Sequence, residues 1–393
     1  MKEIQIPQTV HDWFMSRYPL FDTQVSVSNP SADEKIIEDF YVRYSIRKRA
    51  MDYKRYGYAA ADLVANMFAN ACGAFELGFV GTLTNSGMSA VDVVLRAMQL
   101  RPGDCVLTGK TLYSETAKLF QEWNRIGVIL DRADTVSNNH LSFGAQLSPF
   151  RLAFFETLGS GPALPVLPTV DLLKKLWDKD ITLVLDNTLP GGTLDVFRIY
   201  AKLLEELHQP RMRLVYLESL SKYYRVMGPD DVTAGIILSC PGFIDQCNDV
   251  VSRSGQYLPY SSLAKLPFEL YEVGRRNACA ASEAALKIAD FLKTSPLVRE
   301  VSYPTHYKGG AGAVIYFRAG GNDPFWIANA MYKVFGLPRR SYGHPLTTWL
   351  PFGTTVEPTE PELIRLSAGY HEDAGKVIAM LEEVFEKSSS TTF

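Results

Sequence analysis

The sequence lacks the residue patterns that mark several classes of protein. Its five cysteines are an odd number, are widely scattered and form no C-x-x-C pair, so neither a disulfide framework nor a zinc site is expected. The six histidines include no H-x-x-x-H pair, which argues against a histidine-based metal site. No G-x-G-x-x-G segment follows a candidate strand, which disfavours a nicotinamide-dependent enzyme. We therefore expect buried free thiols and no metal.

An excess of charge and long apolar runs are missing as well. The 40 basic and 43 acidic side chains give a formal net charge of −3, which provides no general attraction to nucleic acid or anionic membranes. No run approaches the roughly 18 apolar residues that a spanning helix needs. The first segment, "MKEIQIPQTVHDWF", has no apolar signal core. We expect a cytoplasmic protein with neither nucleic acid nor membrane as a partner.

The chain is long enough, at 393 residues with 47% hydrophobic side chains, for two domains or for one large α/β domain with an appendage. From about 60 to 255, helical stretches alternate with short apolar runs, which is typical of an α/β fold with a mainly parallel sheet wrapped by helices. The runs are 104–108, 127–130, 151–156, 181–186, 213–218 and 232–238.

Three parts of the chain differ in character. Residues 1–58 are irregular and locally basic, residues 59–255 carry the α/β alternation, and residues 256–393 predict a smaller α+β C-terminal domain. In that last part a long helix precedes the candidate strands "VREVSYP", "AGAVIYFRA" and "ELIRLSAGY", and a final helix follows them.

Polar side chains follow three of the predicted strands. Glu156 ends one apolar run, Asp186 ends the next, and the segment "ESLSK" with Lys222 follows the third. In an open parallel sheet, ligands bind beyond the carboxyl ends of the strands, so these groups are expected to converge. A partly desolvated lysine can form a Schiff base with an aldehyde, and the aldehyde cofactor that needs a lysine is pyridoxal 5'-phosphate. Asp186 is placed to hold its pyridinium nitrogen, and Ser219 and Ser221 its phosphate.

A second candidate for binding phosphate is "TNSGMSAVDVVLRAM". Ser86 and Gly87 open an amphipathic helix from about 88 to 98, so backbone N–H groups and the helix dipole point towards an anion. Taken alone, this segment is only a good helix start, but it gains weight from the other pieces.

These residues resemble, in the same order from about 53 to 373, the pyridoxal-phosphate enzymes of cysteine and methionine metabolism, such as cystathionine synthases and lyases and methionine γ-lyase. The segments that carry the resemblance are "YKR" (53–55), "SGMSA" (86–90), "YSET" (113–116), "LVLDNT" (183–188), "ESLSKYYRVMGPDDVTAG" (218–235) and "IRLSAG" (364–369). The resemblance implies a fold type I pyridoxal-phosphate-dependent transferase that catalyses elimination or replacement at the β- or γ-carbon of an amino acid.

The resemblance also implies roles for single residues. Tyr53 and Arg55 would reach the cofactor phosphate of a neighbouring subunit, which makes the protein a homodimer or a homotetramer. Ser86, Gly87 and Met88 would form the phosphate-binding turn together with Ser219 and Ser221. Tyr113 would stack on the cofactor ring, Asp186 would hold its nitrogen, and Lys222 would form the Schiff base and move protons. Arg365 would hold the substrate α-carboxylate, with help from Ser341, and Tyr53 or Tyr113 could assist proton transfer.

The sequence departs from the family in the segments that contact substrate. "ETLGSGPALPV" has Ser160, Gly161 and Pro162 where the family has Asn-Pro, so Ser160 or a water would replace the asparagine. Glu115 either faces the pocket or, in the alternative, faces solvent or caps a helix. Arg340, in "PRRSYGHPLTTW", either tunes specificity or lies on the surface. These departures predict a substrate other than cystathionine. An aminotransferase or a non-catalytic protein of the same fold is the alternative.

Overall fold

The computed structural model describes residues 59–136, 140–142, 150–224, 232–267, 269–304, 311–320, 326–351 and 363–389. The predicted N-terminal segment 1–58, and with it Tyr53 and Arg55, lies outside the described residues. No helix in the described ranges is long and apolar enough to cross a membrane.

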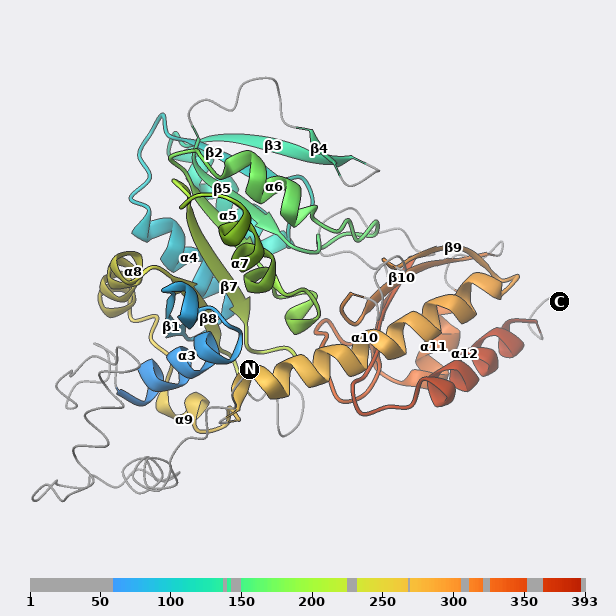
Figure 1. Ribbon diagram of the computed structural model, residues 1–393. Helices are drawn as coiled ribbons and strands as arrows, with labels where there is room; N and C mark the ends of the chain where they lie inside the picture. The colour runs from blue at the N-terminus through green and yellow to red at the C-terminus, as the bar shows by residue number, and fades with distance from the viewer. Residues whose placement is uncertain are drawn as a thin grey trace, which may run out of the picture.

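The larger sheet has eight strands in the order β1-β8-β7-β6-β5-β2-β3-β4 (Figure 1). β2, β3, β5, β6 and β7 form parallel pairs, whereas β8 runs antiparallel to both β7 and β1, and β4 runs antiparallel to β3. The predicted mainly parallel sheet is therefore confirmed. The strands are β1 (Val80–Thr84), β2 (Cys105–Gly109), β3 (Ile129–Val136), β4 (His140–Ser142), β5 (Phe150–Glu156), β6 (Thr182–Asp186), β7 (Arg213–Ser219) and β8 (Gly235–Ser239).

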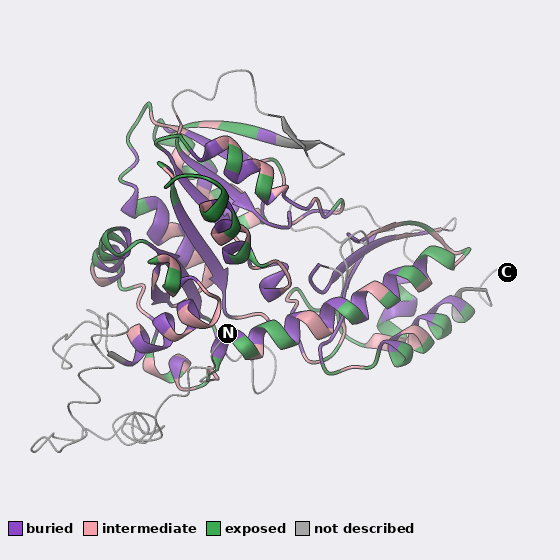
Figure 2. Cartoon of the chain, in the orientation of Figure 1, coloured by how far each residue is buried: buried purple, intermediate pink, exposed green. Residues whose placement is uncertain are grey.

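Helices cover both faces of this sheet, and the central strands between them are buried (Figure 2). One face packs against α3 (Ala59–Ala71), α6 (Thr169–Leu176), α7 (Val196–Glu206) and the first half of α10 (Leu270–Thr294). The other face packs against α4 (Gly87–Ala97), α5 (Ser114–Arg125) and α8 (Pro241–Ser254). Short helical turns lie at η2 (Phe75–Leu77), η3 (Gly191–Thr193) and α9 (Tyr260–Leu263).

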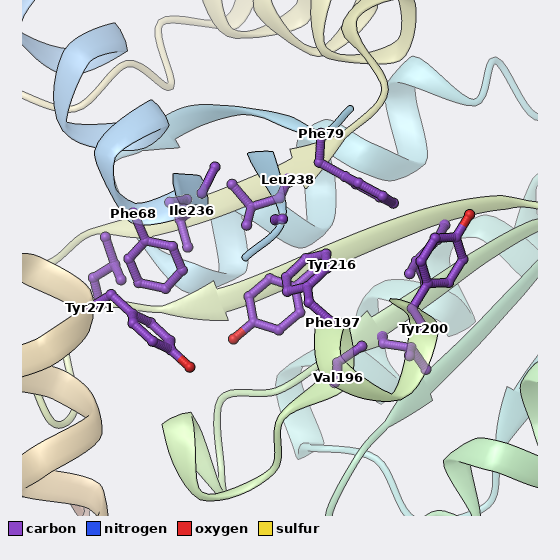
Figure 3. Packing of buried hydrophobic residues seen from close by; sticks show 14 of the residues in the cluster. Phe68, Phe79, Val196, Phe197, Tyr200, Tyr216, Ile236, Leu238 and Tyr271 are labelled. Atoms are coloured by element: carbon purple, nitrogen blue, oxygen red, sulfur yellow. The ribbon is translucent and has the colours of Figure 1, made fainter. Parts of the chain in front are cut away.

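Aromatic side chains fill the first of these cores (Figure 3). The Phe79 ring meets those of Phe197 and Tyr200 edge-on, with centroid distances of 5.3 and 5.6 Å, and Phe68 meets Tyr271 of α10 in the same way at 5.2 Å. Edge-to-face pairs add a modest attraction to the burial of the rings. This packing fixes α3, α7 and α10 against the sheet whose strands end in the polar residues Glu156 and Asp186.

A second, antiparallel sheet has the order β11-β12-β10-β9. Its strands are β9 (Val298–Ser302), β10 (Val314–Ala319), β11 (Thr348–Pro351) and β12 (Leu363–Ser367), and its helices are α11 (Trp326–Phe335) and α12 (Ala374–Ser389). The long helix α10 contributes one half to the core of each sheet (Figure 1). The predicted smaller α+β part is confirmed, although β11 and α11 were not predicted, and the boundaries at 58 and 255 stay predictions.

The segment around Lys222 is fixed by hydrogen bonds on the side away from solvent. The carboxyl of Glu218, at the end of β7, accepts hydrogen bonds from the hydroxyls of Tyr216 and Tyr224, the latter at 2.6 Å. The Tyr223 carbonyl accepts from Asn277 of α10 at 2.7 Å, and its hydroxyl donates to the Leu189 carbonyl at 2.8 Å. Because these groups are buried, each lost bond would leave a polar atom without a partner, so the lysine segment has one preferred conformation.

Glu218→Gln should weaken the pH dependence of stability. Burial raises the pKa of Glu218 to about 8, and the charge of Asp186 adds to the effect, while the phenol hydrogen bonds oppose it. An unfolded glutamate loses its proton near pH 4.3. The folded state therefore holds one extra proton between these values, and raising the pH through this window destabilises it.

Glutamine cannot lose a proton. Between about pH 5 and 8, the free energy of unfolding of the variant should therefore fall less steeply with pH than that of the unchanged protein, and the two slopes should differ by on the order of 1 kcal/mol per pH unit. Denaturant unfolding at several pH values measures this slope. Glu122→Gln, at an exposed position on α5, is the control and should keep the original slope. Equal slopes for Glu218→Gln and the unchanged protein would refute the assignment of the extra proton.

Candidate active site

A cavity of about 240 Å³ lies at the carboxyl ends of β5, β6 and β7, where the sequence places the polar strand ends. It brings together Lys222, Asp186, Tyr113, Ser86, Gly87, Met88, Ser219 and Ser221, all of which were predicted for one site. The cavity lining also includes Glu156, Ser160, Thr188, Thr233 and Tyr342. Parallel register explains this convergence, because Glu156 pairs with Asp186 and Asp186 with Leu217 across adjacent strands.

Two buried carboxyls stand side by side at this edge. Burial raises the pKa of Asp186, while its hydrogen bond from the Thr188 backbone N–H, at 2.9 Å, opposes the shift. Burial also raises the pKa of Glu156, and the neighbouring Asp186 adds to that rise. A buried carboxylate is costly without a cationic partner, so Asp186 would be stabilised by a protonated ring nitrogen in the cavity.

Glu156 holds two walls of the cavity through backbone groups. Its Oε1 accepts from the Tyr113 N–H at 2.5 Å, and its Oε2 accepts from the Ser160 N–H at 3.0 Å. Tyr113 immediately precedes α5, so the first bond fixes the start of that helix. The predicted ring-stacking residue and the residue that replaces the family asparagine are thus attached to one buried carboxyl.

A candidate site for an anion lies at the start of α4, where Ser86 and Gly87 line the cavity. Ser86 caps this helix, its hydroxyl accepting from the Ser89 N–H at 3.0 Å. A Cβ at Gly87 would lie 2.6 Å from the Ser219 Cβ, and one at Gly235 would lie 2.4 Å from the Ser86 carbonyl oxygen. Only glycine therefore allows α4, β7 and β8 to approach this closely. The helix N-terminus and the serine hydroxyls supply donors suited to phosphate.

Further hydrogen bonds hold the predicted phosphate-binding residues at the same end of the cavity. The Ser221 hydroxyl accepts from the Ala234 N–H at 3.1 Å, and the Ser219 N–H donates to the Thr188 hydroxyl at 2.9 Å. Met88 accepts a weak hydrogen bond from Thr116 at 3.6 Å. These contacts fix the predicted phosphate residues in place without using the hydroxyl of Ser219.

Lys222 lies where this cavity meets a second one. Its Nζ donates to the Ser341 hydroxyl at 3.2 Å and lies 4.8 Å from the centre of the Tyr342 ring. Both partners come from the segment between α11 and β11, far from Lys222 in the sequence. The lysine amine is therefore held between the two sheets, at the junction of the two cavities.

The second cavity, of about 450 Å³, contains Arg365 of β12. Arg365 is 5% exposed, and its Nη2 donates to the carbonyls of Arg339 and Arg340, the former at 3.2 Å. Its buried Nε has no hydrogen-bond partner in the described residues. Arg365 lines the cavity, and the planar guanidinium of an arginine is suited to bind a carboxylate.

Two further predicted residues, Glu115 and Arg340, line the second cavity. Glu115 lines it, but its side chain is 47% exposed and pairs with Lys118 at 2.8 Å, so features of both predicted alternatives are present. Arg340 lines it too and is exposed. The predicted Ser341 contacts Lys222, and its carbonyl accepts from Thr348 at 3.3 Å.

The site fits pyridoxal phosphate on the chemistry of its donors. It has a buried carboxyl for the ring nitrogen, a glycine-lined helix start with hydroxyls for the phosphate, and a lysine between them. From the sequence, Glu156 was expected at the converging strand ends but without a role, and Thr188, Thr233 and Tyr342 were not predicted for the site. Glu156 alone had a visible signal, because it ends a predicted strand beside Asp186.

Comparisons with known proteins point to the same family. The family model described as Cys/Met metabolism PLP-dependent enzyme matches residues 31–310. A cystathionine gamma-synthase of Mycobacterium leprae is 27% identical over 348 residues, 78% of this chain and 80% of the relative. An L-methionine gamma-lyase of Pseudomonas putida is 28% identical over 248 residues, which cover 61% and 56% of the two chains.

A solved structure shares the fold. It is a cystathionine gamma synthase from Xanthomonas oryzae pv. oryzae, in complex with aminoacrylate and cysteine, with a TM-score of 0.70 and 22% identity over 88% of this chain and 89% of that one. The family match confirms the predicted resemblance, fold class and cofactor. The chain belongs to the Cys/Met metabolism family of pyridoxal-phosphate-dependent enzymes.

Proposed function

We propose that this enzyme catalyses β- or γ-elimination, or γ-replacement, on a substituted L-amino acid other than cystathionine. The observation that carries the proposal is the position of Lys222, between a cavity with Asp186 and the phosphate donors and a cavity with Arg365. The relatives are named synthases and lyases, which favours this chemistry over the aminotransferase and non-catalytic alternatives.

Pyridoxal phosphate, when bound, supplies an aldehyde that condenses with amines and a ring that accepts the electrons of a carbanion. Around it, Asp186 would hold a proton on the ring nitrogen, and Ser86, Gly87, Ser219 and Ser221 would bind the phosphate. Tyr113 would cover the ring from the start of α5. Each of these groups lines the first cavity, which supports the assignment.

The substrate would enter through the second cavity. Arg365 would bind its α-carboxylate and so orient the α-hydrogen towards Lys222, whose amine would remove that proton. Lys222 could then move a proton at the β-carbon, which γ-elimination requires. Tyr113 lines both cavities and lies on the path of the leaving group, so its hydroxyl is a candidate proton donor.

The finer properties of the enzyme are part of the proposal. The second cavity is lined by two cationic side chains, Arg340 and Lys118, and by one anionic side chain, Glu115, which pairs with Lys118. This set of charges favours a polar or electronegative leaving group. The family resemblance supports a cytoplasmic homodimer or homotetramer in which Tyr53 and Arg55 reach the neighbouring subunit's cofactor.

A test of the function is the absorbance spectrum of the protein supplied with cofactor, alone and with a panel of β- and γ-substituted amino acids. We expect a visible band that changes with a panel member, together with a keto acid or a replacement product. Lys222→Ala should lower turnover by about 10³-fold or more, because the amine is both the attachment point and the base. Lys202→Ala, on α7 away from both cavities, is the control.

Two outcomes would contradict this function. The absence of any visible band in protein supplied with cofactor would remove the assignment of Lys222. Conversion of the cofactor to its amine form after one turnover, with no eliminated or replaced group, would instead establish transamination.

Arg365→Lys should raise KM for the substrate found in this way by about 10- to 100-fold, with a smaller change in kcat. A lysine cannot reproduce the bidentate contact of the guanidinium with a carboxylate, and bonds to charged groups are worth roughly 1.5–3 kcal/mol. Steady-state kinetics measure the effect. Arg339→Lys is the matched control, since Arg339 offers Arg365 only its backbone carbonyl. Equal KM values for the two variants would exclude Arg365 as the carboxylate ligand.

A further inference from the structure

Among the described residues, Tyr342 and Tyr113 are the aromatic side chains that line both cavities, and the proposed chemistry does not use Tyr342. It lies in the segment between α11 and β11, and the centre of its ring is 4.8 Å from the Lys222 Nζ. The preceding residue, Ser341, accepts a hydrogen bond from the same nitrogen at 3.2 Å. Two adjacent residues therefore contact the lysine amine from the side of the smaller sheet.

The backbone of this segment lies directly against that of the lysine. Gly343 has a φ of +68°, and a Cβ there would lie 2.8 Å from the Lys222 carbonyl carbon. Glycine is needed at this position both for its left-handed conformation and for the close approach. The backbone therefore holds Tyr342 and Lys222 next to each other, which keeps the lysine side chain within reach of the ring.

Several contacts hold the segment itself in place. The Arg339 N–H donates to the Trp349 carbonyl at 2.9 Å, and the Thr348 hydroxyl donates to the Ser341 carbonyl at 3.3 Å. Arg365 donates to the carbonyls of Arg339 and Arg340. The Tyr342 ring packs 6.2 Å from that of Tyr223, the residue after the lysine. Tyr342 is therefore a fixed platform.

A cation over an aromatic ring is attracted to the negative face of the ring, most strongly where water is excluded. The Lys222 amine becomes a free ammonium or amine whenever the substrate amine has displaced it from the cofactor. At that stage its position and its proton affinity decide how well it removes and returns protons.

We propose that Tyr342 is a positioning residue for Lys222, and that its ring, together with the Ser341 hydroxyl, holds the displaced lysine amine at the junction of the two cavities. The role of this contact during turnover rests on the proposed function. The contact itself concerns this chain alone and can be measured without turnover.

Other charged and titratable groups also face the two cavities around Lys222. They are Tyr113, Glu115, Lys118, Glu156, Asp186, Tyr316, Arg340 and Arg365. None of them changes in a substitution at Tyr342, so a comparison of two variants at this position isolates the ring.

The test compares Tyr342→Leu, which removes the ring, with Tyr342→Phe, which removes only the hydroxyl. The full-length protein without cofactor is labelled with an amine-reactive anhydride across a range of pH, and the Lys222 peptide is quantified by mass spectrometry. Loss of the ring destabilises the ammonium, so Tyr342→Leu should label at a pH lower by about 0.4 to 1 unit. Tyr342→Phe should label as the unchanged protein does.

In protein loaded with cofactor, the acidic limb of the kcat profile should move to lower pH in Tyr342→Leu and stay in place in Tyr342→Phe. Tyr342→Met, a flexible side chain without a ring, should repeat the Leu result and replaces it if that variant does not fold. Identical labelling of the Leu, Met and Phe variants would overturn the inference. If the protein formed no visible band with cofactor, the proposed function would be contradicted. The labelling of Lys222 in the protein without cofactor would still test its contact with Tyr342.

Discussion

The parallel register of β5, β6 and β7 is the constraint on which the site depends. Because these strands run in the same direction and pair in register, their carboxyl ends form one edge, where Glu156, Asp186 and Glu218 follow one another on adjacent strands. All three carboxyls are buried or nearly so, and burial raises the pKa of each. Placing these three carboxyls at one buried edge therefore disfavours their charged forms at the candidate active site.

The three acids are stabilised in different ways, and the differences assign their roles. Glu156 accepts two backbone N–H groups and so fixes the cavity walls. Glu218 accepts two tyrosine hydroxyls on the side away from the cavity and so fixes the lysine segment. Asp186 accepts a hydrogen bond from the Thr188 backbone N–H and lines the cavity, which makes it the acid best placed for a cationic ring nitrogen.

Local sequence patterns indicated the site residues at strand ends and at a helix start, and the family resemblance indicated Ser341 and Arg365 from the smaller-sheet part of the chain. Neither indicated the contacts that Glu156 and Tyr342 make. Asp186 and Lys222 end or follow apolar runs, and Ser86 and Gly87 open an amphipathic helix, so local patterns located them. Glu156 accepts hydrogen bonds from the backbone N–H groups of Tyr113 and Ser160, and such contacts leave no pattern of side chains in the sequence. Tyr342 reaches Lys222 only through the packing of the smaller sheet on the larger one. β8 was predicted as a strand, but its apolar run does not show that it pairs antiparallel to β7.

The central claim is that Lys222 carries the cofactor, and its most direct test is chemical. The protein supplied with pyridoxal phosphate is reduced with borohydride, digested, and searched by mass spectrometry for a lysine with the phosphopyridoxyl group. The account predicts that group on Lys222, at close to one per chain. Its presence on a different lysine, or its absence from a protein that has bound cofactor, would contradict the assignment of the site.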